Sequence, residues 1–240
     1  MSFTVAVVGA SGRLGQVICS VVDGMEDATL IATLGSRDDL AVVSTADVVV
    51  DVTSHVVSPG IVAAAIAAGR RVLIGTSGRS AERTPTLRTQ VIANPGSGAV
   101  VIPNFSLGSV LATGFAAIAA KHFEAAEIIE AHHEGKADSP SGTAVRTAEL
   151  MLAARNELGP FSAPHVDQRA RGQQVASVPV HSLRLPGVVA KQDVVFGGVG
   201  ETLTISHTTL SSSSYEAGIR LALRRAAAAN GEVIVGLDAV

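Results

Sequence analysis

Apolar runs alternate with helical patterns over the first hundred residues of the chain. Helical spacing covers Arg13–Val22 and Ala81–Ala93, and an Ala-rich helix is predicted with Ser58 as N-cap, Pro59 in its first turn and Gly69 past its end. Five short runs rich in β-branched residues read as buried strands: Phe3–Val8, Thr29–Leu34, Val48–Asp51, Arg71–Ile74 and Ala99–Ile102. Strands and helices in this alternation predict a doubly wound parallel sheet.

The pattern changes after the fifth strand. A helix is predicted for Val110–Phe123, a strand for Glu127–His132, a helix for Thr143–Asn156 and a polar loop for Asn156–Gln174. Three strand-like runs follow without intervening helices, the last two joined by a hairpin-like GGVG: Val178–Leu185, Val188–Phe196 and Glu201–Thr208. Consecutive strands predict an antiparallel or mixed sheet, and therefore a second domain of α+β type.

The end of the chain is expected to return to the first domain. A helix at Tyr215–Ala229 and a strand at Val233–Val235 follow the tract SSSS, which reads as an interdomain linker. The predicted organisation is a dinucleotide-binding domain at 1–104 and 211–240, with a second domain at 105–210.

Composition narrows the class of protein. Among 240 residues, 47% are hydrophobic and none is Trp, so the core must be aliphatic. A net charge of −3 provides no basic field for nucleic acid. Cys19 is the single cysteine, which excludes internal disulfides and thiolate metal clusters. No apolar stretch reaches spanning length, and the first apolar run reads as a strand, not a signal, so a cytoplasmic protein without a membrane partner is expected.

A glycine-rich turn follows the first strand and opens a helix. The sequence GASGRLG places Gly9, Gly12 and Gly15 three residues apart, where glycine permits a tight turn and close approach of a pyrophosphate to the helix start. The alternative is a plain strand-to-helix turn. We expect a dinucleotide here, bound through Gly9, Ala10, Ser11, Gly12, Arg13 and Leu14.

The end of the second strand predicts which dinucleotide binds. Ser36 and Arg37 follow that strand, and Arg13 lies beside the glycine turn, so two guanidinium groups and a hydroxyl favour a 2′-phosphate. NADPH is therefore preferred over NADH, although Asp38 and Asp39 weaken the preference because either carboxylate could pair with Arg37.

A loop after the Glu127–His132 strand gathers titratable groups. His132 and His133 are followed by Lys136, and Ser141-Gly142-Thr143 begins a helix whose N–H groups and hydroxyls suit a carboxylate. An acid, a cation and an anion cradle suit the reduction of a small acidic substrate, with hydride from a nicotinamide and a proton from the protein. The alternatives without a catalytic role are structural histidines, a solvated lysine and an ordinary helix cap. Zinc is not expected, because adjacent histidines rarely ligate one ion and no third ligand is near.

Several motifs in order give the chain a resemblance to a known family. GASGRLG, DVT, GTSG, PNFSLG, EAHHEGKADSPSGTA and GETLTISH resemble the dihydrodipicolinate reductases over nearly the whole chain. The resemblance implies a Rossmann-like domain and an inserted substrate-binding domain that builds a homotetramer. The substrate it implies is a small dicarboxylate of the diaminopimelate route to lysine.

The resemblance also implies residue roles. His132 would be the acid–base residue and Lys136 a second proton donor, while His133, Ser141, Gly142 and Thr143 would lie at the substrate. Further cofactor contacts would come from these residues: Gly75, Thr76, Ser77, Ile102, Pro103, Asn104 and Phe105. Two rival interpretations remain: another two-domain oxidoreductase, such as an amino-acid or sugar dehydrogenase, and a nucleotide sensor without catalysis.

Overall fold

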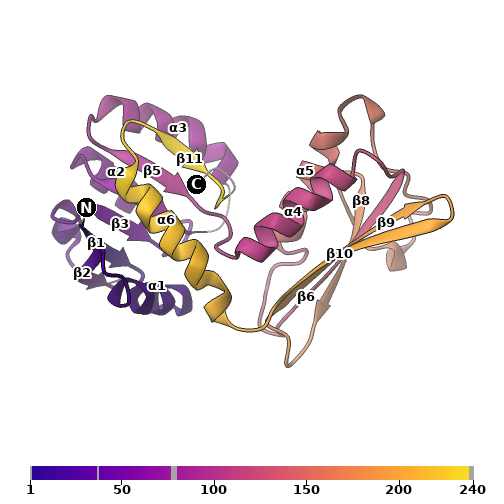
Figure 1. Cartoon of the computed structure of the whole chain (residues 1–240), viewed down its shortest axis with the longest axis horizontal. Helices are drawn as coiled ribbons and strands as arrows, with labels where there is room; N and C mark the ends of the chain where they lie inside the picture. The colour runs from indigo at the N-terminus through magenta and orange to yellow at the C-terminus, as the bar shows by residue number, and fades with distance from the viewer. Residues whose placement is uncertain (1, 37, 77–79, 238–240) are drawn as a thin grey trace. The chain divides into compact units, whose positions relative to one another are not determined.

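The chain folds into two compact units. The structure is a computed structural model that describes residues 2–36, 38–76 and 80–237 (Figure 1). The first unit is made of Met1–Leu107 and Ser212–Val240, and the second of Gly108–Ser211.

The first unit is built on a six-stranded sheet. All its strands pair in parallel, in the order β11-β5-β4-β3-β1-β2. The strands are β1 (Phe3–Val8), β2 (Ala28–Leu34), β3 (Val48–Asp51), β4 (Arg71–Ile74), β5 (Gly98–Val101) and β11 (Val233–Val235). Because β3 and β5 are buried at every residue, they show continuous apolar runs in place of alternation. The predicted doubly wound sheet is confirmed.

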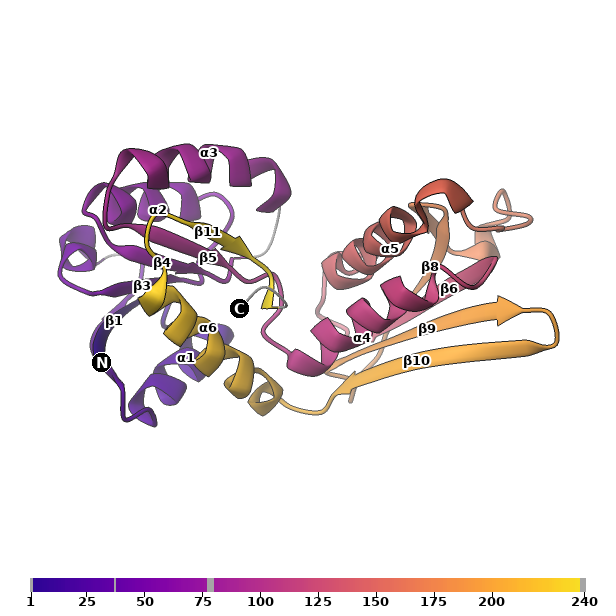
Figure 2. The ribbon, with the colours of Figure 1, turned by 45° about the horizontal axis from the view of Figure 1, so that its top comes forward.

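Helices cover both faces of this sheet (Figure 2). They are α1 (Arg13–Asp23), α2 (Ser58–Ala67), α3 (Ser80–Ala93) and α6 (Glu216–Ala228), with short 3₁₀ turns η1 (Leu40–Ser44) and η4 (Ser212–Tyr215). Side chains of α2 and α3 pack on Val49, Val72 and Val101 of the sheet. The N-cap prediction for Ser58 is wrong: Val57 precedes the helix in αR conformation, so the helical backbone begins one residue earlier.

The second unit has a five-stranded mixed sheet in the order β10-β9-β6-β8-β7. Its strands are β6 (Ala125–His132), β7 (Gln173–Val175), β8 (Val178–Arg184), β9 (Ala190–Gly198) and β10 (Glu201–Thr209). Strand β7 was not predicted, because three residues with two glutamines carry no periodic signal and form a strand only by pairing with β8. Two single turns, η2 (Asn156–Leu158) and η3 (Arg169–Arg171), also lie in the predicted loop.

Two helices pack on one face of this mixed sheet. Alanines of α4 (Leu107–Ala119) and α5 (Gly142–Arg155) enclose a core with Ile128, Val194 and Phe196. The opposite face is open to solvent, where Ile129 and Leu183 are each 39% exposed. One face of the sheet is therefore buried under the helices, and the other face exposes both apolar and polar side chains.

The pairing of β6 with β8 decides which side chains meet. The two strands are parallel, with Glu130 opposite Ser182 and His132 opposite Arg184. Side chains alternate along a strand, so Glu130 and His132 share the helix-covered face of the sheet with Ile128. Within the described residues, no helix has both the length and the apolar character needed to cross a membrane.

Candidate active site

The glycine turn of the first unit leaves no room for side chains. Gly9 has φ +91, and a Cβ there would lie 2.8 Å from the Val52 carbonyl oxygen. A Cβ on Gly15 would lie 2.2 Å from the Gly9 oxygen. The backbone N–H of Gly9 donates to the Leu34 carbonyl over 2.8 Å, which ties the turn to the end of β2. Glycine is therefore required by close backbone packing at both positions.

Helix α1 begins at this turn with its first amide groups available. Gly12 is the N-cap, no side chain caps the helix, and its first turn holds no acidic residue. A cavity of about 630 Å³ adjoins the turn, lined among others by Ala10 and Ser11 on one side and by Gly35 and Asp38 on the other. An uncapped helix start beside a cavity fits the anionic end of a dinucleotide.

The structure describes two of the three residues predicted to select the cofactor. Arg13 and Ser36 are exposed, whereas Arg37 and Ser77 lie outside the described residues. The Asp38 carboxylate accepts a hydrogen bond of 2.7 Å from the Gly35 N–H. Asp39 instead accepts from the Ala41 N–H at the start of η1. Backbone amides thus hold both aspartates, and Asp38 brings a negative charge to the cavity wall.

The ends of β3 and β4 are joined by the carboxylate of Asp51, the first residue of the DVT motif, whose role was not predicted from the sequence. Asp51 is fully buried, and its Oδ1 accepts from the Thr53 hydroxyl over 2.5 Å. Its Oδ2 accepts from the Thr76 hydroxyl over 3.2 Å. Thr76, a predicted cofactor residue, is therefore fixed in place by Asp51.

Of the remaining predicted cofactor residues, Phe105 packs against Gly75. A Cβ on Gly75 would lie 2.8 Å from the Phe105 ring, so the two residues are in close contact. Phe105 and Ile102 are buried, and Asn104 Oδ1 accepts from the Ser106 N–H over 2.9 Å. The side chains of Ile102 and Phe105 belong to the core, and the Ile102 N–H donates to the Ile74 carbonyl over 2.8 Å.

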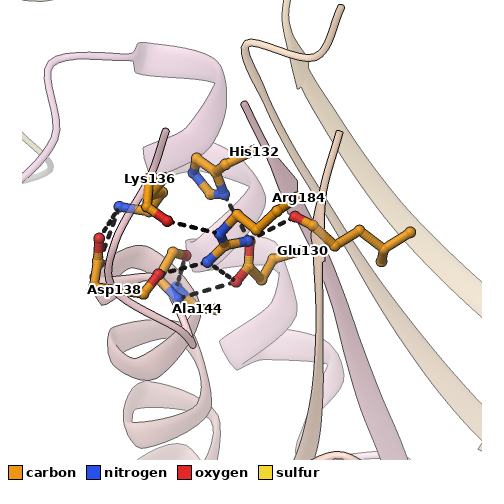
Figure 3. A network of polar contacts seen from close by, with 8 residues as sticks. Glu130, His132, Lys136, Asp138, Ala144 and Arg184 are labelled. Atoms are coloured by element: carbon orange, nitrogen blue, oxygen red, sulfur yellow. Dashed lines mark hydrogen bonds and ion pairs between the residues drawn. The ribbon is translucent and has the colours of Figure 1, made fainter. Parts of the chain in front are cut away.

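In the second unit, the predicted acid His132 is part of a cluster around a buried carboxylate, which we call the inner cluster: Glu130, His132 and Arg184. Figure 3 shows these side chains beside Lys136 and the start of α5. Nδ1 of His132 lies 2.6 Å from Oε2 of Glu130. The Arg184 guanidinium donates to both carboxylate oxygens, each over 2.9 Å. Glu130 is fully buried, whereas 16% of the His132 side chain is exposed. The histidine therefore has one anchored nitrogen and an accessible edge.

Burial and hydrogen bonding act in opposite directions on the inner cluster. Burial raises the pKa of Glu130, but hydrogen bonds from Arg184, Ser182 and His132 outweigh it and hold that pKa below its ordinary value. The pKa of His132 is lowered, first by burial and then by the charges of Lys136 and Arg184, while Glu130 acts to raise it. Glu130 is therefore ionised and offsets part of the cost of protonating His132.

Lys136 lies on the loop after β6, paired with an aspartate. Its Nζ donates to the two oxygens of Asp138 over 2.7 and 2.9 Å. Its backbone N–H donates to the His133 carbonyl over 3.1 Å, which closes a turn and leaves the His133 side chain half-buried. Arg184 braces the same loop by donating to the Lys136 and Asp138 carbonyls.

The start of α5 supplies amide donors, but fewer hydroxyls than expected. Ser141 is the N-cap, and its hydroxyl accepts from the Ala144 N–H over 3.2 Å. Its own N–H donates to Glu130, and the residue is 2% exposed. Gly142 is exposed and Thr143 half-buried. The helix start thus offers Gly142 and Thr143 to a ligand, because Ser141 is used to build the site.

Three residues of this region were missed from the sequence. Glu130 lies two residues before His132, so strand periodicity could have placed it on the same face. Asp138 lies two residues after Lys136, close enough to pair. Arg184 is 54 residues from Glu130 and meets it only through the register of β6 and β8. In the part of the chain that the structure describes, no group of three His, Cys, Asp or Glu side chains is arranged to hold a metal ion.

A glycine turn at an uncapped helix and a separate unit with acid–base side chains define the class of dinucleotide-dependent oxidoreductases. Family comparison makes the assignment specific. The family described as "Dihydrodipicolinate reductase, N-terminus" matches residues 3–105, and "Dihydrodipicolinate reductase, C-terminus" matches residues 108–240. The chain therefore belongs to the dihydrodipicolinate reductase family.

Individual relatives agree with this membership. The chain is 59% identical to a 4-hydroxy-tetrahydrodipicolinate reductase of Clavibacter sepedonicus over 99% of its length and 86% of the relative's. It is 41% identical to the reductase of the same name in Nocardia farcinica, over 99% and 98% of the two chains. A solved dihydrodipicolinate reductase from Paenisporosarcina sp. TG-14, bound to dipicolinate, superposes with a TM-score of 0.83 at 30% identity, covering 99% of each chain.

Proposed function

We propose that this protein reduces 4-hydroxy-tetrahydrodipicolinate to tetrahydrodipicolinate, with NAD(P)H as reductant, in the diaminopimelate route to lysine. One observation carries the proposal: in this member of the family, His132 Nδ1 and the Ser141 N–H at the start of α5 both meet the buried carboxylate of Glu130. Arg184, bound to the same carboxylate, also donates to the Lys136 carbonyl and so ties the lysine loop to this cluster. Both rival interpretations are weaker. A sugar or amino-acid dehydrogenase does not account for the family match, and a sensor does not account for the acid–base groups.

The two domains have separate roles in this proposal. Residues 1–104 and 211–240 bind the cofactor, and residues 105–210 bind the substrate and build a homotetramer. The exposed apolar side chains of Ile129 and Leu183, on the open face of the second sheet, support an assembly through that face. Light scattering on the purified protein measures the number of subunits, and a monomer would rule out the tetramer.

The glycine turn and the amide groups of Arg13 and Leu14 would hold the pyrophosphate, and Thr76 would lie near the nicotinamide end. The cofactor supplies a hydride when it is bound. Arg13 with Ser36 favours NADPH, while Asp38 on the cavity wall favours the unphosphorylated ribose of NADH. We propose a preference for NADPH, and kcat/KM for the two cofactors tests it; a strong preference for NADH would contradict it.

The substrate is a ring with two carboxylates, which requires positive groups and amide donors. Lys136 would meet one carboxylate, with Asp138 exchanged for the ligand, and the N–H groups of Gly142 and Thr143 would meet a carboxylate at the start of α5. His133 lies on the same loop and would complete the pocket. The relative bound to dipicolinate, which is also a ring dicarboxylate, supports this choice of ligand.

In this reaction the side chains of the protein would transfer a proton to the substrate. Loss of water from the hydroxylated ring gives a conjugated imine, and hydride addition to the conjugated carbon leaves an enamine that must take one proton. His132, in its protonated form, would donate that proton, with Lys136 as the second donor. The net reaction consumes substrate, NAD(P)H and one proton, and it releases the reduced ring, NAD(P)⁺ and water.

A coupled assay tests this function. The preceding synthase generates the unstable substrate in place from pyruvate and aspartate semialdehyde, and absorbance follows the oxidation of NADPH and NADH. We expect oxidation that depends on both the synthase and this protein. Cofactor binding without oxidation would favour the sensor.

A further inference from the structure

We propose that Glu130 is a positioning residue: fixed by Arg184, its carboxylate holds the Nδ1 proton of His132 and makes Nε2 the nitrogen that transfers a proton to the substrate. The inference deepens the proposed function and rests on it, since it takes His132 as the proton donor.

The groups that meet the Glu130 carboxylate, the Ser182 side chain among them, act as hydrogen-bond donors. Oε1 accepts from Arg184 Nη2 over 2.9 Å and from the Ser141 N–H over 3.2 Å. Oε2 accepts from Arg184 Nη1 over 2.9 Å and lies 2.6 Å from His132 Nδ1. A guanidinium and a backbone amide can only donate, so Glu130 is ionised and acts as acceptor. His132 Nδ1 must then carry a hydrogen in both charge states of the ring.

The titrating proton is thereby confined to Nε2. In the neutral ring Nε2 has a lone pair, and in the charged ring it has the proton that a substrate can receive. Without the carboxylate, the ring could turn or adopt the other tautomer, and a donor on the wrong nitrogen would face the buried side. Nδ1 of His132 is held from within the fold, so Nε2 is the nitrogen left for the ligand.

In the described part of the chain, three charged groups act on the His132 ring. Glu130 on β6 favours the protonated ring, and Arg184 on β8 and Lys136 on the loop oppose it. Asp138, paired with Lys136, reduces the effect of that lysine. Glu130 is in direct contact with His132, whereas Asp138 is not. Removal of the Glu130 charge therefore lowers the pKa of His132 and decreases the fraction of protonated His132 at a given pH.

A second cluster on the same strand offers a matched control, which we call the outer cluster: Glu127, His181 and Arg171. Glu127 accepts from Arg171 over 2.6 Å and lies 2.7 Å from His181 Nε2. It lies three residues before Glu130 and therefore on the opposite face of β6. Glu127→Gln makes the same chemical change as Glu130→Gln without touching His132.

The experiment measures pH profiles of kcat in the coupled assay for the wild type, Glu130→Gln, Glu127→Gln and His132→Ala. We expect Glu130→Gln to lower kcat by about 10- to 100-fold, as for outer carboxylate partners of metal-bound histidines. We also expect the decline of kcat at high pH to move to lower pH. Glu127→Gln should keep its profile, and light scattering checks that it keeps its assembly. A purely structural role for Glu130 would lower kcat without moving the profile.

Direct observation of the ring decides the case if Glu130→Gln does not fold. Long-range ¹H–¹⁵N correlation spectra of the ¹⁵N-labelled wild type report which nitrogen carries the hydrogen, with His132→Ala assigning the signal. A neutral ring with hydrogen on Nδ1 supports the proposal, and one with hydrogen on Nε2 overturns it.

The two proposals fail in different ways. No oxidation of NAD(P)H by the wild type would end the proposed function. An active wild type and an inactive His132→Ala, together with unchanged kcat and pH profile in Glu130→Gln, would end the Glu130 proposal alone.

Discussion

The inner and outer clusters place the same three residue types on opposite faces of one strand. Both join a β6 glutamate to an arginine and a histidine. They differ in burial, since Glu130 is fully buried while 35% of the Glu127 side chain is exposed. They also differ in the bound nitrogen, which is Nδ1 in His132 and Nε2 in His181. Residue types alone therefore do not define an acid–base site; burial and orientation do.

The ion pairs of the two clusters differ in strength because the clusters differ in exposure to solvent. In the outer cluster of a single chain, water screens the charges and can replace any partner. In the inner cluster the carboxylate is fully buried, so Arg184, His132 and the Ser141 N–H satisfy it in place of bulk solvent. The same pairing is thus a surface ion pair on one face of the sheet and a fixed electrostatic element on the other.

The largest expected difference concerns stability. Arg184→Leu leaves Glu130 buried and without its cationic partner, and should lower the free energy of unfolding by about 3 kcal/mol or more. Arg171→Leu removes a half-exposed pair and should cost about 1 kcal/mol or less. Urea titrations followed by circular dichroism measure both values. Equal losses would show that the two faces do not differ in burial as described.

The next difference concerns catalysis. His132→Ala should lower kcat on the order of 10²-fold or more, because a general acid is lost. His181→Ala, which removes the outer imidazole, should keep more than half of the wild-type kcat. The coupled assay compares the two variants, and a similar loss in both would remove the distinction between the clusters.

Two lysine–aspartate pairs extend the comparison. Lys136 pairs with Asp138 near the inner cluster, and Lys191 pairs with Asp193 on β9. Lys136→Ala should lower kcat by about 10²-fold through loss of the second proton donor. Lys191→Ala has the same change in charge and should leave kcat within about twofold, which the coupled assay tests. Near-normal turnover in Lys136→Ala would remove this lysine from the mechanism.

The smallest expected difference is in acid stability. The folded pKa of Glu130 lies below its ordinary 4.5, so this group stabilises the fold above that pH and the contribution is lost as the pH falls through the folded value. The pKa of Glu127 is also lowered, by hydrogen bonds from Arg171 and His181 that outweigh its burial. Below about pH 5, the urea midpoint of the wild type should fall most steeply as the pH is lowered. Glu130→Gln should show the weakest dependence of the midpoint on pH, and Glu127→Gln an intermediate one. A steeper dependence in Glu130→Gln than in the wild type would contradict this.

Much of the fold was predictable because its signals are local. Strands β1, β3, β4 and β11 have the predicted bounds, since short β-branched runs that stop at glycine or a polar residue need no tertiary information. Strand β7 was missed because its pairing with β8, not its residues, makes it a strand.

The candidate site was predictable only in part, for a similar reason. The spacing of His132, Lys136 and Ser141 indicated a loop between a strand and a helix, which the structure has. The roles of neighbours differed from expectation. Ser141 caps α5 with the hydroxyl that was predicted for the ligand, because a helix start inside the protein must satisfy its own amides first.

The sequence by itself determined the order of most elements, the glycine turn and the loop that carries the candidate acid–base groups, because these depend on residues near one another in the chain. Only the tertiary structure decided that Arg184 meets Glu130 and that His132 is held by Nδ1. Those contacts follow from the register of two strands whose paired residues are more than fifty positions apart, and no local pattern specifies that register.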